Sequence, residues 1–184
     1  MRRLSGWRLL AFIVVCVAFN LGIGFMITTM KAPLYLDSIG TVLAAALGGL
    51  WAGIACGVLS VIIGSAYTPT LWAYAGTMVA IALYVALVRP LGYLSRLLPT
   101  ALFGIGLGVV CAVVSSPVTT YLWKGASLSG ADAVTAFFSA KGATLLVSVI
   151  LTGLAADPID KLVTSLIAFV IIGRVPRNFV GHNT

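Results

Sequence analysis

The chain contains, from Ser38 to Val88, the uncharged stretch SIGTVLAAALGGLWAGIACGVLSVIIGSAYTPTLWAYAGTMVAIALYVALV. These 51 residues include no Asp, Glu, Lys or Arg. As one helix rising about 1.5 Å per residue, the stretch would be about 76 Å long, more than twice the ~30 Å hydrocarbon core of a bilayer. A chain that folds back and forth through lipid needs such a stretch, so the sequence predicts an integral membrane protein.

The composition of the whole chain agrees with this prediction. Hydrophobic residues make up 61% of the 184 residues and charged residues only 8%, which is far from the profile of a soluble globular domain. The net charge of +7 could suggest nucleic-acid binding. However, the basic residues are scattered among short hydrophilic breaks and do not share one soluble face, so membrane topology explains them better and we expect no nucleic-acid partner.

Hydropathy predicts an all-α, polytopic membrane helix bundle of about six transmembrane helices, with residues 1–184 forming a single transmembrane domain. The six candidate segments are residues 8–29, 39–64, 71–88, 97–116, 133–155 and 159–173. The N-terminal basic residues Arg2, Arg3 and Arg8 favour a cytoplasmic start. Six crossings return the C-terminal end to the same side, so both termini are expected in the cytoplasm.

The two arginines after the third segment complicate this topology. Six plain crossings would put Arg89 and Arg96 on the outer face, against the usual distribution of positive charge. A second topology breaks the segment 39–64 at Gly48 and Gly49 into a hairpin with short legs, which turns both arginines inward. This topology requires residues 133–173 to supply only one net crossing, with part of them lying as a lid or a broken helix. The resemblance described below favours the hairpin.

Charged residues within the later segments give two further expectations. Lys141 lies eight residues into an apolar segment, where a cation must face water, snorkel or pair with a carboxylate such as Asp157, Asp160 or Asp37. We therefore consider Lys141 either a binding residue or half of an ion pair. The sequence Asp157-Pro158-Ile159-Asp160 is typical of a helix start, with a capping residue, a first-turn proline and an acidic residue in the first turn.

Catalytic and metal-binding signals are missing from the sequence. The three cysteines lie singly in apolar segments, and the chain has no Glu, no intramembrane His, no evident pair of intramembrane Asp and no nucleophile motif. We therefore expect no catalytic residues, no metal and no cofactor. There is no phosphate-binding loop either, so any ATP hydrolysis must be performed by another polypeptide.

Three clusters of polar and aromatic residues follow the ends of apolar segments. They are Tyr35 and Asp37; Ser65, Tyr67, Thr68, Thr70, Trp72 and Tyr74; and Ser115, Ser116, Thr119, Thr120, Tyr121, Trp123 and Lys124. In the hairpin topology all three clusters reach the outer face, where they could form a partly apolar pocket for a small ligand. The alternative is an interfacial belt of aromatic side chains.

Several of these sequences resemble a known family. Residues 32–41 (APLYLDSIGT) and 44–53 (AAALGGLWAG) are similar to the second and third helices of the substrate-binding S components of energy-coupling factor (ECF) transporters. The ending is similar as well, with residues 157–161 (DPIDK) before an apolar helix and 174–177 (RVPR) after it. The size, the basic N-terminus and the lack of an ATPase motif also fit, so the resemblance covers essentially the whole chain.

The resemblance implies a six-helix subunit of the bacterial plasma membrane that binds a vitamin or related micronutrient near the outer face. It would deliver the ligand through a transmembrane coupling protein and two cytoplasmic ATPases. The loop positions that match the family suggest, as substrate-binding residues, Tyr35, Asp37, Tyr67, Trp72, Tyr121, Trp123 and Lys141. Docking on the coupling protein would use small residues of the first helix. Here only Ala18 and Gly22 approximate the expected pattern of two alanines four positions apart.

Two functions from other classes remain open at this stage. A membrane sensor or assembly subunit would bind a partner protein and have no ligand pocket. A stand-alone secondary transporter would work without ATP and would more often have titratable groups near the middle of the membrane. The apparent scarcity of such groups argues mildly against the transporter.

Overall fold

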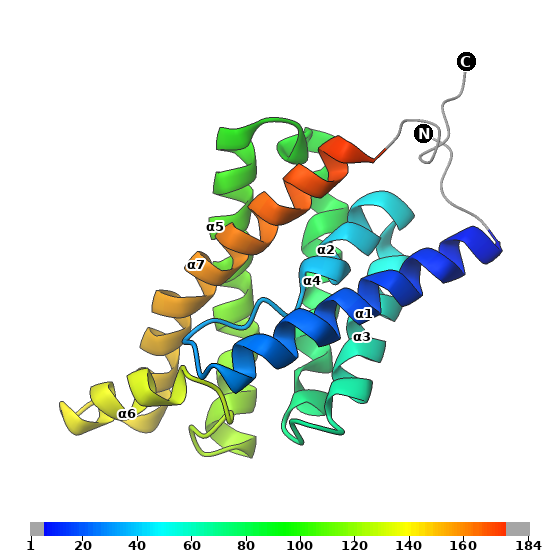
Figure 1. Cartoon of the computed structure of the whole chain (residues 1–184). Coiled ribbons are helices and arrows are strands. Elements are labelled where there is room, and N and C mark those ends of the chain that lie inside the picture. The colour runs from blue at the N-terminus through cyan, green and yellow to red at the C-terminus, as the bar shows by residue number, and fades with distance from the viewer. Residues whose placement is uncertain (1–5, 176–184) are drawn as a thin grey trace.

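The structure, a computed structural model, describes residues 6–175, and its secondary structure there is helical with no strand. Helices suit lipid because every backbone hydrogen bond is made within the segment itself. The helices are α1 (Trp7–Thr29), α2 (Ile39–Leu43), α3 (Leu50–Gly64), α4 (Ala75–Val88), α5 (Leu97–Pro117), α6 (Asp132–Ala140) and α7 (Leu145–Arg174), arranged as a bundle in Figure 1. Short π- and 3₁₀-helical turns extend several of them.

Within residues 6–175, three helical stretches are long and apolar enough to cross a membrane: Trp7–Thr29, Leu71–Leu91 and Leu97–Leu122. Two shorter apolar helices, Ile39–Gly48 and Leu50–Gly64, lie between the first and second of these. The prediction of an all-α membrane helix bundle is therefore confirmed.

The long uncharged stretch is broken where the hairpin topology required. A π-helical turn, Ala44–Gly48, continues α2, and Gly49 then adopts a φ of 94° before α3 begins. A positive φ of this kind is favourable only for glycine, so Gly49 allows the chain to reverse direction. Figure 1 shows α2 and α3 running in opposite directions from this turn. The alternative of one continuous span over residues 39–64 is wrong.

The helix boundaries expected for residues 133–155 and 159–173 also differ from those in the structure. The short helix α6 ends at Ala140, Gly142 turns the chain with a φ of 90°, and α7 then continues without a break past Pro158 to Arg174. The expectation that Asp157 and Pro158 begin a helix is wrong, because both lie inside α7. Residues 133–173 therefore provide one long helix and a short one lying across its end (Figure 1), as the hairpin topology required.

Small residues allow the helices to approach closely. At Gly108 of α5, an added Cβ atom would lie 2.3 Å from the Cα atom of Pro158 in α7, and at Gly104 it would lie 2.7 Å from the Cα atom of Leu162. Only glycine fits between backbones at these distances. The four-residue spacing of small side chains in α5 therefore serves packing within the bundle.

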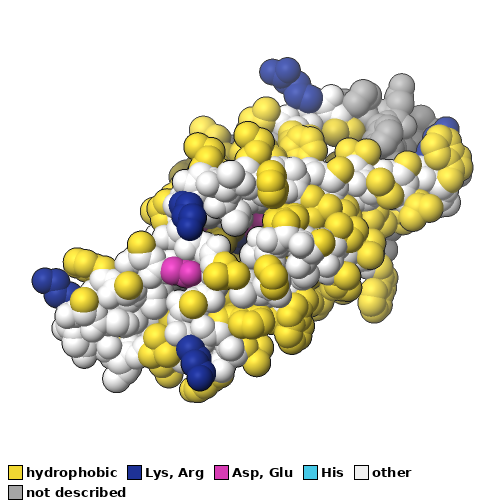
Figure 2. Space-filling view, turned by 60° about the horizontal axis from the view of Figure 1, so that its bottom comes forward, with side chains coloured by type: hydrophobic (Ala, Val, Ile, Leu, Met, Phe, Trp, Pro, Cys, Tyr) yellow, Lys and Arg dark blue, Asp and Glu magenta, His cyan; other side chains and the backbone are white. Residues whose placement is uncertain are grey.

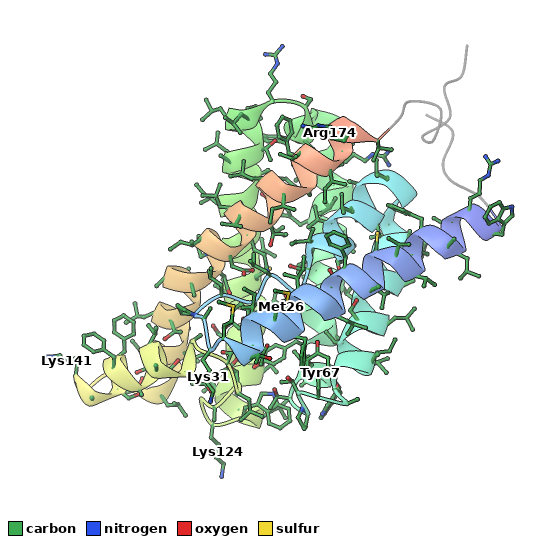
Figure 3. The ribbon with its side chains drawn as sticks, in the orientation of Figure 1. Met26, Lys31, Tyr67, Lys124, Lys141 and Arg174 are labelled. Atoms are coloured by element: carbon green, nitrogen blue, oxygen red, sulfur yellow. The ribbon has the colours of Figure 1, made fainter. Side chains whose placement is uncertain are left out.

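Several basic residues lie at one or the other end of the bundle. The connection between α4 and α5, which carries Arg89 and Arg96, lies at the same end as Arg174, and we call this the arginine end (Figures 1 and 3). Figure 3 shows Lys31, Lys124 and Lys141 at the opposite end, which we call the lysine end. The positive-inside tendency predicts that the arginine end faces the cytoplasm.

Candidate functional site

A cavity of about 90 Å³ lies toward the lysine end, between helices and the loops that join them. A single buried water needs about 10–15 Å³, so the cavity has room for several waters or one small organic molecule. Figure 2 looks onto this end and shows an acidic side chain visible in a hollow between surface side chains. The lining residues come from α1, α4, α5, α7 and three loops: Gly24, Thr28, Tyr35, Asp37, Tyr67, Thr68, Leu71, Tyr74, Thr77, Met78, Ile81, Cys111, Ser115, Thr119, Ser127, Leu128, Ser129, Asp157 and Lys161.

All three polar clusters identified in the sequence contribute to this cavity. The second and third clusters are joined by a hydrogen bond of 2.8 Å between the Tyr74 hydroxyl and Thr119 Oγ1. The Thr70 hydroxyl of the second cluster donates a hydrogen bond of 2.9 Å to the carbonyl oxygen of Ser127, in the loop that follows the third. The expected convergence of the clusters is therefore a feature of the structure, whereas ligand binding by them stays a prediction.

The loop of residues 30–38 places the first cluster. One carboxylate oxygen of Asp160, in α7, accepts hydrogen bonds of 2.8 Å from the backbone N–H groups of both Tyr35 and Leu36. Leu36 has a φ of 46°, an uncommon conformation for a residue with a side chain. The Asp160 carboxylate thus holds the loop in a conformation that positions Tyr35 and Asp37 at the cavity.

A buried ion cluster lies directly behind this loop. The Lys161 ammonium group pairs with Asp160, donates a hydrogen bond of 2.9 Å to Ser38 Oγ, and lies 3.8 Å from a carboxylate oxygen of Asp37. The Lys161 and Asp160 side chains are 4% and 0% exposed. Charges this deeply buried are stable only when they are paired and hydrogen-bonded, and here both conditions are met.

Burial also affects the ionisation of the two loop residues. Burial raises the pKa of Tyr35 well above its ordinary value, so its phenol remains a neutral hydrogen-bond donor throughout the physiological range. Burial likewise raises the pKa of Asp37, and the nearby Lys161 ammonium opposes that change.

The seven residues proposed for substrate binding are divided by the structure. Tyr35, Asp37 and Tyr67 line the cavity, and the Tyr67 ring packs edge-on against Phe25 at a centroid distance of 5.3 Å. The other four, Trp72, Tyr121, Trp123 and Lys141, are not among the lining residues.

The aromatic residues outside the cavity lie near its rim. The rings of Trp72 and Trp123 pack edge-on with centroids 6.1 Å apart, and Trp72 is 55% exposed. Tyr121 is 71% exposed. The exposure of Trp72 and Tyr121 fits an interfacial aromatic belt. The Nε1 atom of Trp123 is buried without a hydrogen-bond partner among the described residues, and ligand contact by the three residues stays a prediction.

Lys141 follows α6 and is exposed, with its ammonium group 5.8 Å from the centroid of the Phe137 ring. It forms no ion pair with Asp157, Asp160 or Asp37, so the expected ion pair is wrong, whereas ligand binding by Lys141 stays a prediction. The reason is the turn at 141–144, which ends the predicted transmembrane segment and places Lys141 at the lysine end (Figure 3).

Sequence reasoning missed the charged residues that do reach the interior. Asp157 and Asp160 were attributed to a helix start, but with Lys161 they occupy positions i, i+3 and i+4 of α7 and therefore share one face. That spacing was the available signal. The expectation of no paired Asp does not hold for the interior of the bundle, because α7 carries the buried Asp157 and Asp160 close to Lys161.

The two small residues proposed for partner docking lie on the outer surface of α1. Ala18 and Gly22 are both exposed, and no atom lies within 4 Å of a Cβ built on Gly22. Their neighbours on this face are large apolar residues such as Val15 and Met26, which are 58% and 62% exposed. The surface is open to lipid or to a partner helix, and docking there stays a prediction.

Comparison with known proteins adds no further information. No protein-family model, curated protein or solved structure matches the chain.

Proposed function

We propose that the protein is a membrane-embedded substrate-binding subunit of a micronutrient importer, of the kind that the sequence resembles. It binds a small molecule such as a vitamin in the cavity at the lysine end, which faces the outside. A transmembrane coupling protein and two cytoplasmic ATPases, all separate polypeptides, drive release of the ligand to the inside.

The cavity is the observation that supports this proposal most. It has apolar side chains such as Met78 and Ile81 beside a small number of hydroxyl and carboxylate groups, which is the usual composition of a small-ligand site. Its lining residues lie toward one end of the bundle and include none from the connection between α4 and α5 at the arginine end. Such a cavity suits a subunit that holds a ligand and passes it to a partner.

The first experiment measures ligands and partners together. The full chain is extracted gently from its native membrane, and native mass spectrometry records any bound small molecule and any associated ATPase subunits. We expect one small molecule bound per protein chain, and a complex of the protein with a coupling protein and ATPases. The proposal fails if the protein carries no small molecule, gains no thermal stability from any compound in a vitamin panel, and associates with no ATPase.

A second candidate function is supported by the buried ion cluster. Titratable groups inside the bundle, here Asp157, Asp160 and Lys161, are typical of ion-coupled secondary transporters. This function predicts uptake into liposomes by the chain alone, driven by an ion gradient and without ATP. Uptake under those conditions would replace the importer-subunit proposal with that of a secondary transporter.

A further inference from the structure

The cavity has more negative than positive charge. Three carboxylates, those of Asp37, Asp157 and Asp160, lie close to the single ammonium group of Lys161, which leaves a formal surplus of two negative charges. An uncompensated charge away from water is costly, because a medium of low dielectric constant does not solvate it. The distribution of hydrogen bonds shows which carboxylate lacks compensation.

Asp160 and Lys161 are engaged mainly by structural contacts. Asp160 accepts two backbone hydrogen bonds and pairs with Lys161, which also donates to Ser38 and lies near Asp37. These contacts hold the loop of residues 30–38 against α7. Of the two side chains, only Lys161 also lines the cavity.

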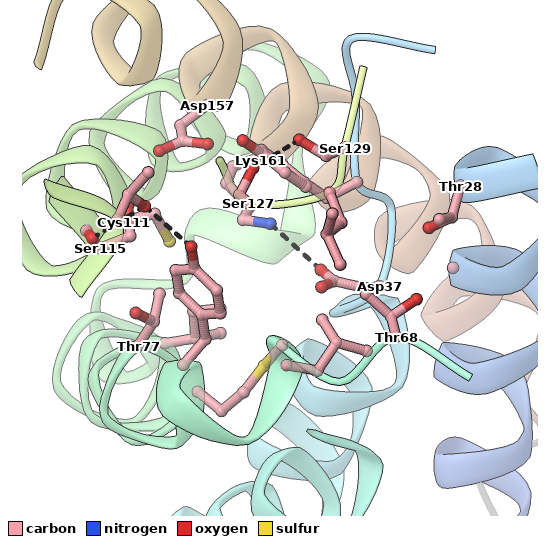
Figure 4. Close-up of a pocket in the computed structure, with 18 of the residues that line it drawn as sticks. Thr28, Asp37, Thr68, Thr77, Cys111, Ser115, Ser127, Ser129, Asp157 and Lys161 are labelled. Carbon is pink, nitrogen blue, oxygen red and sulfur yellow. Dashed lines mark hydrogen bonds and ion pairs between the residues drawn. The ribbon is translucent and has the colours of Figure 1, made fainter. Parts of the chain in front are cut away.

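Asp157 lies one turn before Lys161 in α7 and is different. It is 5% exposed and lines the cavity (Figure 4), yet its side chain makes no hydrogen bond or ion pair with any described residue. A buried carboxylate without a donor is rare, because the great majority of buried polar side chains have a partner. The missing partner of Asp157 is therefore expected to be something that enters the cavity.

An independent observation on α4 also indicates a ligand. Thr77 lines the cavity and is only 9% exposed, but its Oγ1 has no hydrogen-bond partner in the structure. The lining residues also include Tyr35, Tyr67 and Tyr74. Aromatic faces attract cations.

We propose that the ligand of this cavity is a small organic cation, whose positively charged group pairs with Asp157 and whose remaining surface lies against the tyrosine rings and the Thr77 hydroxyl. This inference rests on the proposed function, because it names the substrate class of the same site. A metal ion fits less well, since no three His, Cys, Asp or Glu within residues 6–175 are grouped to hold one.

The inference is tested on the full chain in lipid nanodiscs with a panel of micronutrients sorted by charge. The cations are thiamine and choline, the neutral compounds pyridoxine and riboflavin, and the anions nicotinate and pantothenate. Thermal unfolding detects binding and titration calorimetry measures the affinity. We expect binding by one of the cations and by none of the anions.

The Asp157→Asn variant then tests the residue. It should weaken the binding of the cation by at least about tenfold, because a charge-assisted hydrogen bond is replaced by a neutral one. The matched control is Arg96→Gln, which changes the charge of an exposed residue at the arginine end and should change the affinity less than about twofold. If Asp157→Asn does not fold, Asp37→Asn neutralises the other carboxylate at the cavity and should weaken cation binding several-fold.

The outcomes separate this inference from the proposed function. If a neutral or anionic compound binds and Asp157→Asn does not affect its binding, the proposal of a cationic ligand is wrong. The proposed importer function is then still supported. Equal loss of affinity in Asp157→Asn and Arg96→Gln also overturns the cation inference, because Asp157 would then act only through the overall charge. Failure of every compound to bind overturns the cation inference, whereas the importer-subunit proposal fails only if the protein also carries no small molecule and associates with no ATPase.

Discussion

Replacing Lys161 by methionine tests how the buried ion cluster stabilises the bundle. Methionine keeps most of the apolar length of the side chain but removes the ammonium group that contacts Asp160, Asp37 and Ser38. The variant therefore removes the counter-charge that Asp160 and Asp37 contact.

Two estimates of the cost agree. At an effective dielectric constant of about 20, opposite charges about 4 Å apart attract by about 4 kcal/mol, and breaking a buried pair typically costs about 3–5 kcal/mol. Alternatively, an unpaired carboxylate can become neutral by binding a proton. For a group with an ordinary pKa near 3.9, protonation at pH 7 costs about 4 kcal/mol of free energy, so the loss of stability per unpaired carboxylate cannot exceed this value. We therefore expect Lys161→Met to lower the free energy of unfolding by about 3–5 kcal/mol at pH 7.

The second estimate also predicts the pH dependence of the variant. If its folded state holds a protonated carboxyl group that is ionised after unfolding, the folded state binds more protons, and its stability rises as the pH falls. The deficit relative to the original protein should shrink by about 1.4 kcal/mol per pH unit for each such group between pH 7 and pH 5.

Unfolding by SDS from mixed micelles, followed by fluorescence of the four tryptophans, measures these differences. The matched control is Lys141→Met, an exposed lysine whose replacement should change stability by less than about 0.5 kcal/mol. Adding Asp160→Asn to Lys161→Met should recover at least about 1 kcal/mol, because it removes one unpaired charge and keeps the acceptor for the loop. A Lys161→Met cost no larger than that of the control, or no recovery in the double variant, would refute the reasoning.

Three further predictions concern packing, docking and orientation. Gly108→Ala should prevent normal packing of α5 on α7. Gly76→Ala, where no atom lies within 4 Å of the added methyl group, should be neutral or stabilising by up to about 1 kcal/mol. Thermal unfolding compares the two variants, and equal effects would contradict the close approach of α5 to α7. Gly22→Leu should leave stability unchanged and abolish co-purification of the ATPase module, while unchanged co-purification would remove Gly22 from the interface. Single-cysteine variants in a background without native cysteines should be labelled by a membrane-impermeant maleimide from outside at Lys124→Cys and only from inside at Arg96→Cys, and the reverse pattern would invert the topology.

Part of the fold could be predicted from charge. The 51 uncharged residues from Ser38 to Val88 required repeated crossing, and the positions of Arg89 and Arg96 argued for a hairpin around Gly49, which the resemblance favoured as well. Both inferences depend on the high cost of charge in lipid, which is large enough to override local preferences. They were reliable for that reason.

The later helices could not be predicted in the same way because local signals there were ambiguous. Asp157 followed by Pro158 is typical of a helix start, yet a proline is tolerated inside a membrane helix when its neighbours compensate for the lost hydrogen bond. Whether the chain continues through Pro158 is decided by α5, which fits Gly108 against it. That contact joins residues about 50 positions apart, and no local pattern reveals it.

The same limitation affected the site. Tyr35, Asp37 and Tyr67 were identified because polar residues after apolar segments indicate an interface with water. Lys161 and Asp157 were overlooked because a charge inside a helix is stable only through partners from other helices. Lys141 was selected as a candidate instead, because the apolar residues around it were interpreted as a membrane-spanning segment.

The attachment of the loop to Asp160 has a consequence for biosynthesis. The two hydrogen bonds that hold Tyr35 and Leu36 join them to a residue about 125 positions later. A ribosome adding 5–20 residues per second, roughly, needs several seconds or more to reach that residue. Until then the nascent chain lacks the carboxylate that fixes this segment, so a polypeptide truncated before α7 should insert its early helices yet have no formed binding site.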